Sequence, residues 1–462
     1  MATHITKAFN KSEAVKWLIT ILVPLCVALI PANGVYTDTM RIFFIITLAG
    51  IMLMAFETMN MMVVSLLLPI AYMIFLAPAN IVFSGWTVAT PYVCVGAMLL
   101  ANVLTSVGIL NRIAYWCIAK CGGSFKMTCY GVLLVGLIIS LMTGVMGGLL
   151  VCTFAFGVCK AFGMERSKET AIIMMVALFG TATAEMFIYK PVFMSLINSS
   201  VQAFIPTFGI KYLDLMLHNW PFLLFCALMI EVYCRFFHAK ADVDGKEYFQ
   251  QKLQELGKTT SAEKKGAILT AAVVLYMVSS QWTGLPMDYG LMIIPWFAFL
   301  PGIKIGADSD VRNINYEMVF FMMACMGIGA VSSYVGVAGL VSTSFAEKLV
   351  PYGPTVALLV IYIIGVVVNF LMTPMAMLAA FTGPVTQIAL SLGINPLSAV
   401  YTFYFACDQI ILPYEYVNYL LAYSFGVMSM KHFIQLTGTK MIIGTVFLVI
   451  VMFPYWKLIG IF

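Results

Sequence analysis

Charged side chains are scarce in this chain. Of its 462 residues, 10% are Asp, Glu, Lys or Arg and 62% are hydrophobic, whereas an ordinary soluble domain carries about 25% charged residues. This is too little charge to cover the surface of a soluble protein of this length. The hydrophobic residues run in blocks of about 20, the length that crosses a bilayer as a helix. These blocks lack the period-two alternation of barrel strands, so the sequence predicts an all-α polytopic membrane protein.

Motifs for metal binding, disulfide formation and catalysis are also missing. The four histidines are dispersed, and none forms a spaced pair suited to a metal or a haem. The 11 cysteines are scattered and odd in number, which argues against a disulfide framework. Cys117 and Cys121 have a metal-like spacing but no partner pair, so we interpret them as packing residues. We expect no catalytic residue, no metal site, no cofactor and no nucleic-acid partner.

The apolar blocks predict about eleven membrane-spanning helices. They lie near residues 15–31, 40–56, 60–77, 90–110, 170–206, 219–237, 266–281, 287–301, 315–340, 394–422 and 440–459. Two further apolar stretches, 127–160 and 355–392, are each interrupted in the middle by small or helix-breaking residues. Because each half is expected to be too short to span, we predict two re-entrant hairpins. Irregular tips of this kind are tolerated only where they are buried in protein or face a water-filled cavity.

Positive charge predicts how the spans are oriented. With a cytoplasmic N-terminus, 20 of the 25 Lys and Arg residues fall on the inside, which is a strong positive-inside bias. That count includes Lys440, placed just before the last span. No A-x-A-like cleavage site follows the first apolar run, so we expect a retained first helix. We predict a multi-pass protein of the cell (inner) membrane, with a cytoplasmic N-terminus and an external C-terminus.

The two halves of the chain repeat the same landmarks in the same order. A polar segment of mixed charge, 236–265, separates them and is predicted to be a cytoplasmic linker. The first repeat, with the N-terminal helix, would be 1–235 and the second 266–462. An odd number of spans inverts the second copy, and inverted repeats are typical of secondary transporters with a substrate site near the midplane. The matched landmarks are Val107-Gly108-Ile109 with Val335-Gly336-Val337, Thr143 with Thr373, and Glu185 before Pro191 with Asp408 before Pro413.

Charges inside membrane spans are costly and suggest function, and three of those in this chain stand out. They are Glu185, Lys190 and Asp408. The nearby Pro191 and Pro413 remove a backbone donor and disfavour helix at the preceding residue, so each span is expected to be broken near mid-membrane. A break offers amide groups to an anion and carbonyl groups to a small cation. For Glu185 and Lys190, the alternative is a buried ion pair that fixes packing.

The order of elements resembles the divalent anion–sodium symporter family. The resemblance covers nearly the whole chain and rests on four stretches: Val-Gly-Ile-Leu-Asn-Arg-Ile-Ala at 107–114, Val-Gly-Val-Ala-Gly-Leu at 335–340, Leu412-Pro413, and the closing Tyr455-Trp456-Lys457-Leu458-Ile459-Gly460. It implies eleven spans, two hairpins, a homodimer and an elevator-like movement of a transport domain against a scaffold. It also implies a dicarboxylate, citrate or sulfate as substrate.

The hairpin tips of that family normally carry Ser-Asn-Thr, which contributes to substrate and sodium sites. Here the tips read Thr143-Gly144-Val145 and Thr373-Pro374-Met375, so a hydroxyl remains but both asparagines are gone. Asn369, before the second tip, can keep one sodium-site oxygen. For the substrate, the predicted residues are Thr143, Gly144, Lys190, Thr373, Pro374 and Pro413. For the coupling ion, Na⁺ or H⁺, they are Glu185, Asn369, Asp408 and Glu415.

Several functions stay open at this point. The leading hypothesis is a secondary transporter of a small anion, coupled to sodium or protons. A cation–proton antiporter of the same superfamily is the runner-up, because the paired acids at 185 and 408 can take up protons. An ion channel, with hairpins lining its pore, belongs to another class, and a membrane enzyme has no motif to support it. Glu185→Gln would leave Lys190 unpaired, so Asp408→Asn is the preferred test of coupling.

Overall fold

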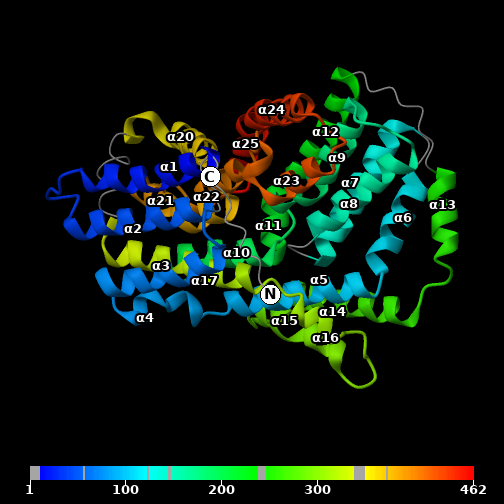
Figure 1. The fold of residues 1–462 in the computed structure, drawn as a ribbon, viewed down its shortest axis with the longest axis horizontal. Coiled ribbons are helices and arrows are strands. Elements are labelled where there is room, and N and C mark those ends of the chain that lie inside the picture. Colours follow the sequence, from blue (N-terminus) through cyan, green and yellow to red (C-terminus); the bar gives the residue numbers. More distant parts are fainter. Residues whose placement is uncertain are drawn as a thin grey trace.

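The computed structural model describes residues 11–55, 58–121, 124–143, 147–237, 246–337, 349–370 and 373–462. Within these ranges the chain is helical and contains no strand, in agreement with the predicted all-α class (Figure 1). The first half contains α1 (Lys11–Ala28), α2 (Asp38–Ala55), α3 (Met61–Phe75), α4 (Ala79–Val82), η1 (Ser84–Trp86), α5 (Thr90–Ser106), α6 (Ile109–Cys121), α7 (Phe125–Thr143), α8 (Gly147–Ala161), α9 (Lys168–Thr181), η3 (Thr183–Met186), α10 (Pro191–Gln202), α11 (Tyr212–Asn219) and α12 (Pro221–Phe236). The second half contains α13 (Lys246–Glu255), α14 (Ser261–Thr283), α15 (Asp288–Ile293), η4 (Ile294–Phe299), α16 (Asp308–Arg312), α17 (Tyr316–Tyr334), η6 (Val350–Tyr352), α20 (Gly353–Asn369), α21 (Pro374–Ser391), α22 (Pro396–Cys407), η7 (Pro413–Glu415), α23 (Val417–Ser424), α24 (Met430–Phe447), η8 (Leu448–Met452) and α25 (Phe453–Leu458).

Polar caps fix where several of these helices begin. Ser167 and Thr260 each accept a hydrogen bond from a backbone N–H in the first turn of α9 and of α14. Asn395 does the same for α22, and Ser429 for α24. These acceptors satisfy N–H groups that the first turn of a helix leaves unpaired. The helix starts are therefore encoded locally, including that of α24.

The helices form two groups in Figure 1. The group containing α6, α7, α8, α9, α12, α13, α23 and α24 lies on the right of the view, and the group containing α1–α4, α17, α20, α21 and α22 lies on the left. Two interrupted helices, α9–α10 and α22–α23, pass from one group toward the other. Both interruptions therefore lie where the two groups meet.

The interrupted helices pack against the two hairpins in a reciprocal way. In the first half, α9 packs against the hairpin α7–α8, while α10 packs against α21 of the other hairpin. In the second half, α22 packs against the hairpin α20–α21, while α23 packs against α8. Such an exchange of partners is expected of two inverted copies. The repeat boundaries, 1–235 and 266–462, stay a prediction.

Two matched landmarks of the repeat share a backbone conformation. Gly108 and Gly336 both have φ of +81°, in the left-handed region that favours glycine. At Gly108 the chain turns by 69° between α5 and α6. The span predicted at 90–110 therefore ends in a sharp bend at this glycine.

Helix lengths support membrane embedding and correct two details. Among the described residues, four helical stretches are long and apolar enough to cross a membrane, or up to six if each bent pair is one span. Further apolar helices such as α3 and α20 are shorter, so the count of about eleven crossings stays a prediction. The expectation that each hairpin half is too short to span is wrong for α7, which has 19 residues. The last span begins at Met430 and not near 440, because Ser429 caps the helix there.

Close contact between α7 and α9 depends on two glycines. A Cβ atom added to Gly136 would lie 2.6 Å from Cα of Gly180, and one added to Gly180 would lie 2.7 Å from Cα of Gly136. Ser140 on α7 also donates a hydrogen bond of 2.8 Å to the carbonyl of Gly180. Small residues at such crossings let membrane helices approach closely. The first hairpin is therefore held tightly to the first interrupted helix.

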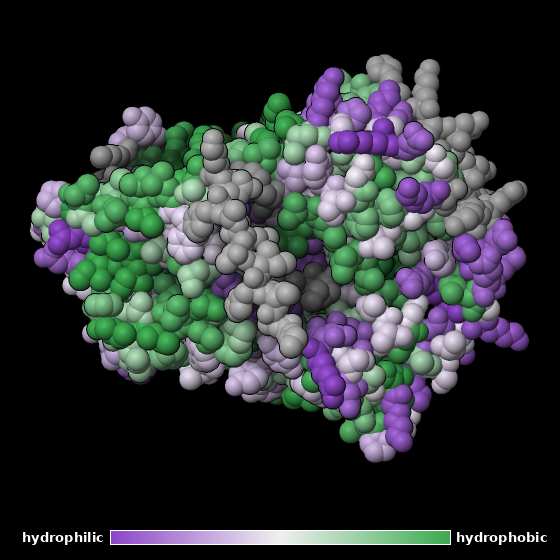
Figure 2. Space-filling view, viewed as in Figure 1, coloured by the Kyte–Doolittle hydropathy of each residue, from purple (hydrophilic) through white to green (hydrophobic). Residues whose placement is uncertain are grey.

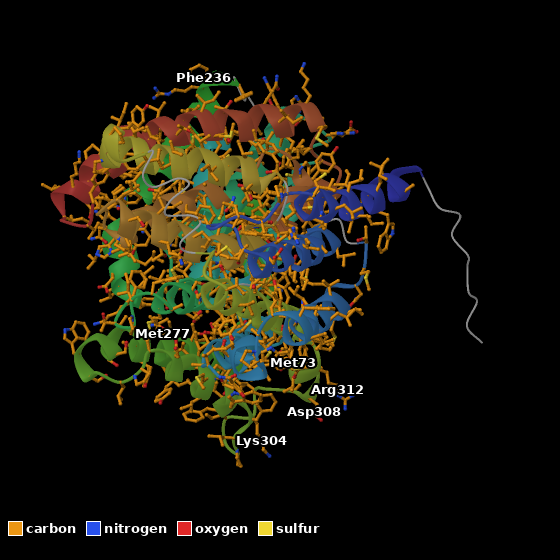
Figure 3. All side chains as sticks on the ribbon, turned by 90° about the vertical axis from the view of Figure 1, so that its left-hand side faces the viewer. Met73, Phe236, Met277, Lys304, Asp308 and Arg312 are labelled. Atoms are coloured by element: carbon orange, nitrogen blue, oxygen red, sulfur yellow. The ribbon has the colours of Figure 1, made fainter. Side chains whose placement is uncertain are left out.

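The surface is apolar over much of the molecule. Hydrophobic side chains cover the side that carries α1, α2 and α3, while hydrophilic side chains gather near α13 and α16 (Figure 2). Phe236 and the segment with Lys304, Asp308 and Arg312 lie at opposite edges of the molecule in Figure 3. An apolar surface of this extent fits a chain surrounded by lipid.

The predicted linker contains a helix that packs onto the first half. Phe249 on α13 is 2% exposed, and its ring lies 6.0 Å from that of Tyr115 on α6 and 5.9 Å from that of Phe154 on α8. At the end of the linker, Glu263 in the first turn of α14 forms an ion pair of 2.8 Å with Arg112 on α6. The linker is thus not only a solvated connector, because α13 docks on α6 and on the first hairpin.

Candidate functional site

The two interrupted helices meet at a small buried cavity. It has a volume of about 10 Å³, roughly the smallest space that admits a water molecule. Residues from both halves of the chain line it: Ala182, Glu185, Met186, Phe193, Pro374, Tyr404, Cys407, Asp408 and Tyr416. The predicted residues Glu185, Pro374 and Asp408 therefore lie around one cavity.

Glu185 and Lys190 occupy the break between α9 and α10. Glu185 lies in η3, is 6% exposed and accepts a hydrogen bond of 3.0 Å from the hydroxyl of Tyr416. Lys190 immediately precedes α10, which Pro191 begins, and is 1% exposed. The two charged groups are close enough to attract each other electrostatically. The break brings them together, and their role in transport stays a prediction.

Asp408 forms an ion pair that the sequence analysis did not anticipate. It follows α22 directly, and its Oδ2 lies 2.7 Å from Nζ of Lys440 on α24. The same Nζ donates hydrogen bonds to the carbonyl of Asp408 at 2.7 Å and to the hydroxyl of Tyr419 at 3.0 Å. Lys440 is 1% exposed. Its assignment to the cytoplasmic end of the last span is therefore wrong, because α24 has already begun at Met430.

Lys440 and Tyr416 are site residues that sequence reasoning missed. A signal for Lys440 was present, because Ser429 is a good cap and no proline interrupts the run from 430 to 440. Tyr416 carried no comparable signal, since nothing in the sequence distinguishes it among the 22 tyrosines of the chain.

Buried oxygen acceptors without donors are concentrated around the end of α22. Asn369, the last residue of α20, is 0% exposed and donates to the carbonyls of Cys407 at 3.3 Å and Gln409 at 3.2 Å. In the described part of the chain, no donor reaches Oδ1 of Asn369 or Oε1 of Gln409. Buried acceptors are costly without a partner. Hard cations take oxygen ligands of this kind.

Glu415 is held by its local backbone. Its carboxylate accepts hydrogen bonds from the N–H groups of Leu412 at 2.7 Å and Ile411 at 3.2 Å. It thereby closes the short turn η7, which Pro413 begins. Glu415 is 2% exposed. Its geometry gives it a structural role in the second break, and a role in coupling stays a prediction.

The two hairpin tips border different cavities. Thr143 ends α7, donates to the carbonyl of Ile139 at 2.8 Å, and lines a cavity of about 30 Å³ together with Tyr189 and Pro191. Gly144 lies outside the described residues. Thr373 is half-buried and precedes Pro374, which lines the cavity beside Glu185 and Asp408. Convergence of both tips on one site therefore stays a prediction.

Comparisons with known proteins agree with a transporter fold. The YdaH transporter of Alcanivorax borkumensis matches with a TM-score of 0.59 and 14% identity, over 98% of this chain and 99% of that chain. MtrF of Neisseria gonorrhoeae, described as illuminating a class of antimetabolite efflux pumps, matches with a TM-score of 0.55 and 11% identity, over 97% and 95%. At such identities the similarity concerns the fold alone. No curated protein sequence matches this chain.

Reciprocal hairpins and paired broken helices are typical of secondary transporters, and the family that this chain matches is one of transporters and not of enzymes. Residues 11–462 match the protein family described as the sodium:sulfate symporter transmembrane region. The chain belongs to this family, which confirms the resemblance seen in the sequence. It is accordingly a secondary transporter of anions.

Proposed function

We propose that this chain couples the transport of a small dianion or trianion, such as a dicarboxylate, citrate or sulfate, to sodium. In this proposal the two interrupted helices, their hairpins and α24, whose Lys440 pairs with Asp408, move together against the remaining helices, as in an elevator. The observation that carries the proposal is the pair of buried amide oxygens on Asn369 and Gln409. A small cation satisfies them, whereas the anion itself cannot.

Sodium is favoured over protons by the oxygens at the second break that carry no titratable group. The carboxylate of Asp408 already has a cationic partner within the protein, because Nζ of Lys440 lies 2.7 Å from it. The amide oxygens of Asn369 and Gln409 do not titrate. They suit a metal cation and not a proton.

The anion would bind where Lys190 and the start of α10 meet. This helix has no side-chain cap, so its first-turn N–H groups are available, and helix starts favour negative charge. The cavity of about 10 Å³ is far below the roughly 300–1,000 Å³ of ligand pockets. Anion binding therefore requires the second hairpin to move away at Pro374, which lines the cavity wall.

Two further features belong to the proposal. The family resemblance implies a homodimer, in which the scaffold helices of two copies would pair. The direction of transport needs a direct test, because the MtrF structure is described as an antimetabolite efflux pump. Both influx and efflux should therefore be followed.

Flux into liposomes tests the proposal. We expect radiolabelled sulfate, succinate or citrate to accumulate with an inward sodium gradient and not with a pH gradient alone. Asn369→Ala should raise the sodium concentration needed for half-maximal uptake, while Asn369→Asp, which keeps an oxygen, should retain sodium dependence. Asn219→Ala is the matched control, because this buried amide already accepts a hydrogen bond of 3.2 Å from Trp456.

The same assay separates the competing functions. Uptake that is driven by a pH gradient and does not depend on sodium would show coupling to protons, with Glu185 or Asp408 as the proton carrier. Exchange of sodium for protons without anion flux would identify a cation–proton antiporter. A steady current without accumulation would identify a channel.

A further inference from the structure

A second, larger cavity lies away from the breaks. Its volume is about 290 Å³, and it shares no lining residue with the cavity beside Glu185 and Asp408. It is bordered by η1, by the end of α10, by α17 and by α21. This size is near the lower limit of small-molecule pockets, roughly 300 Å³. The cavity can therefore hold a compact ligand.

Among the residues that the structure describes, no charged side chain lines this cavity. Its walls are built largely from small residues of α17 and α21, with Phe204 and Met326 as the large apolar members. An ion of either sign would lose its hydration there without gaining a partner of opposite charge. The transported anion is thus excluded, and so is an organic cation.

Four polar side chains of the wall already donate to carbonyl groups of the protein. The hydroxyls of Ser199 and Ser200 donate to carbonyls of their own helix, each at 2.8 Å. Ser84 donates to the carbonyl of Ile81 at 2.8 Å, and the amide of Gln202 donates to the carbonyl of Phe208 at 2.8 Å. A hydroxyl that donates in this way still has lone pairs to accept with. The wall therefore offers acceptors, and a ligand must bring the donors.

We propose that this cavity binds a small uncharged molecule with an apolar body and a hydroxyl or amide donor, of the aliphatic alcohol class. α10 and α21 pack on each other, and both contact α17. An occupant touches all three helices and resists their relative displacement. If the proposed elevator movement takes place, such a molecule inhibits transport without competing with the anion.

Photolabelling tests the site without requiring transport. The probe is octan-1-ol carrying a diazirine on its chain, and labelled peptides of the purified full-length protein are identified by mass spectrometry. We expect saturable labelling of segments around Ser199, Gly329 and Gly383, and its loss with excess octan-1-ol. The matched diazirine analogues of octanoate and octylammonium should not label these segments. Equal labelling by either ion overturns the uncharged assignment.

Gly329 allows the cavity to be filled without a clash. A Cβ atom added there has no heavy atom within 4 Å, so we use Gly329→Phe to fill the cavity and Gly329→Ala to leave most of it free. Labelling should be lost in Gly329→Phe and kept in Gly329→Ala. If Gly329→Phe does not fold, the double variant Ser199→Ala/Ser200→Ala, which removes two acceptors, should weaken labelling instead. Unchanged labelling in the folded variants overturns the site.

Flux measurements separate this inference from the proposed function. If anions are transported, octan-1-ol should lower the maximal rate without changing the KM, in wild type and in Gly329→Ala but not in Gly329→Phe. Saturable labelling with no effect on flux overturns the bridging mechanism and leaves the site standing. Failure of anion transport with intact labelling overturns the proposed function and not the site.

Discussion

At the scale of single residues, the buried pair of Asp408 and Lys440 has the largest energetic consequence. The two side chains are 3% and 1% exposed and 2.7 Å apart. Removing one member of such a pair leaves an uncompensated buried charge, which costs about 3–5 kcal/mol. Asp408→Asn is thus a less direct test of coupling than the sequence suggested, because loss of the carboxylate also strands Lys440.

We therefore predict that Asp408→Asn and Lys440→Met each lower the thermal unfolding temperature in detergent. The double variant should recover most of the loss, because neither charge is left alone. Thermal unfolding followed by intrinsic fluorescence checks this as a double-mutant cycle. Additive losses in the double variant would contradict the pairing.

Most of the candidate site residues could be predicted one by one, but not their partners. Glu185, Lys190 and Asp408 stood out as charges within apolar blocks. Which helix supplies the counter-ion of Asp408 depends on how α24 packs, and that is set by tertiary contacts. For Glu415 the structure adds a local role, because its carboxylate closes a turn, and the predicted role in coupling stays a prediction.

At the scale of elements, the crossing of α7 and α9 controls how the first hairpin is held. Gly136 and Gly180 leave no room for a side chain between these helices. We predict that Gly180→Val forces them apart and destabilises the protein by about 1–3 kcal/mol, the usual cost of overpacking. Gly157→Val on α8 is the control, because a Cβ there has no atom within 4 Å. Similar unfolding temperatures for the two variants would argue against the close crossing.

The linker attachment is acid-sensitive. Burial alone would raise the pKa of Glu263, but hydrogen bonds from Arg112 and from the backbone N–H of Thr260 outweigh it and lower the pKa below its usual value. A lowered pKa in the folded state contributes stability above the unfolded pKa, and this contribution is lost as the pH falls through the folded one.

We predict that the gain from Glu263 is present at neutral pH and disappears on acidification below about pH 4. Glu263→Gln should therefore lower the unfolding temperature at pH 7 and have little effect at the acid end. Unfolding scans from pH 7 downwards check this. An equal difference between wild type and variant at every pH would show that Glu263 acts only through its shape.

Element boundaries were harder to predict than element types. The apolar blocks located both hairpins and both interrupted helices, because hydrophobic length and proline positions are local properties. The start of α24 was misplaced because Lys440 was assumed to face water, and its burial depends on a distant acid. The length of α7 was underestimated because the helix begins at Phe125, before the apolar stretch predicted from 127, and includes Thr143, which was assigned to the break.

At the scale of the whole molecule, the predicted orientation remains to be tested. In a cysteine-free background, Gln250→Cys on α13 should react with an impermeant thiol reagent only from the cytoplasmic side. Gly34→Cys, in the exposed segment between α1 and α2, should react only from outside. Labelling of residue 250 in intact cells would reverse the topology.

The reciprocal packing of the hairpins has an electrical consequence, because it brings the charged residues of both breaks into one part of the molecule. The two breaks carry three acids, Glu185, Asp408 and Glu415, and one base, Lys190, and Lys440 on α24 is a second base beside them, so with all five groups ionised the formal charge is −1. A charge that crosses the whole membrane potential changes in energy by about 2.3 kcal/mol per 100 mV. If the breaks move as one body, the empty carrier is itself voltage-sensitive, whereas one bound sodium ion makes it electrically silent. The voltage dependence of the return step would then report the protein's own charge, and Glu415→Gln should abolish it.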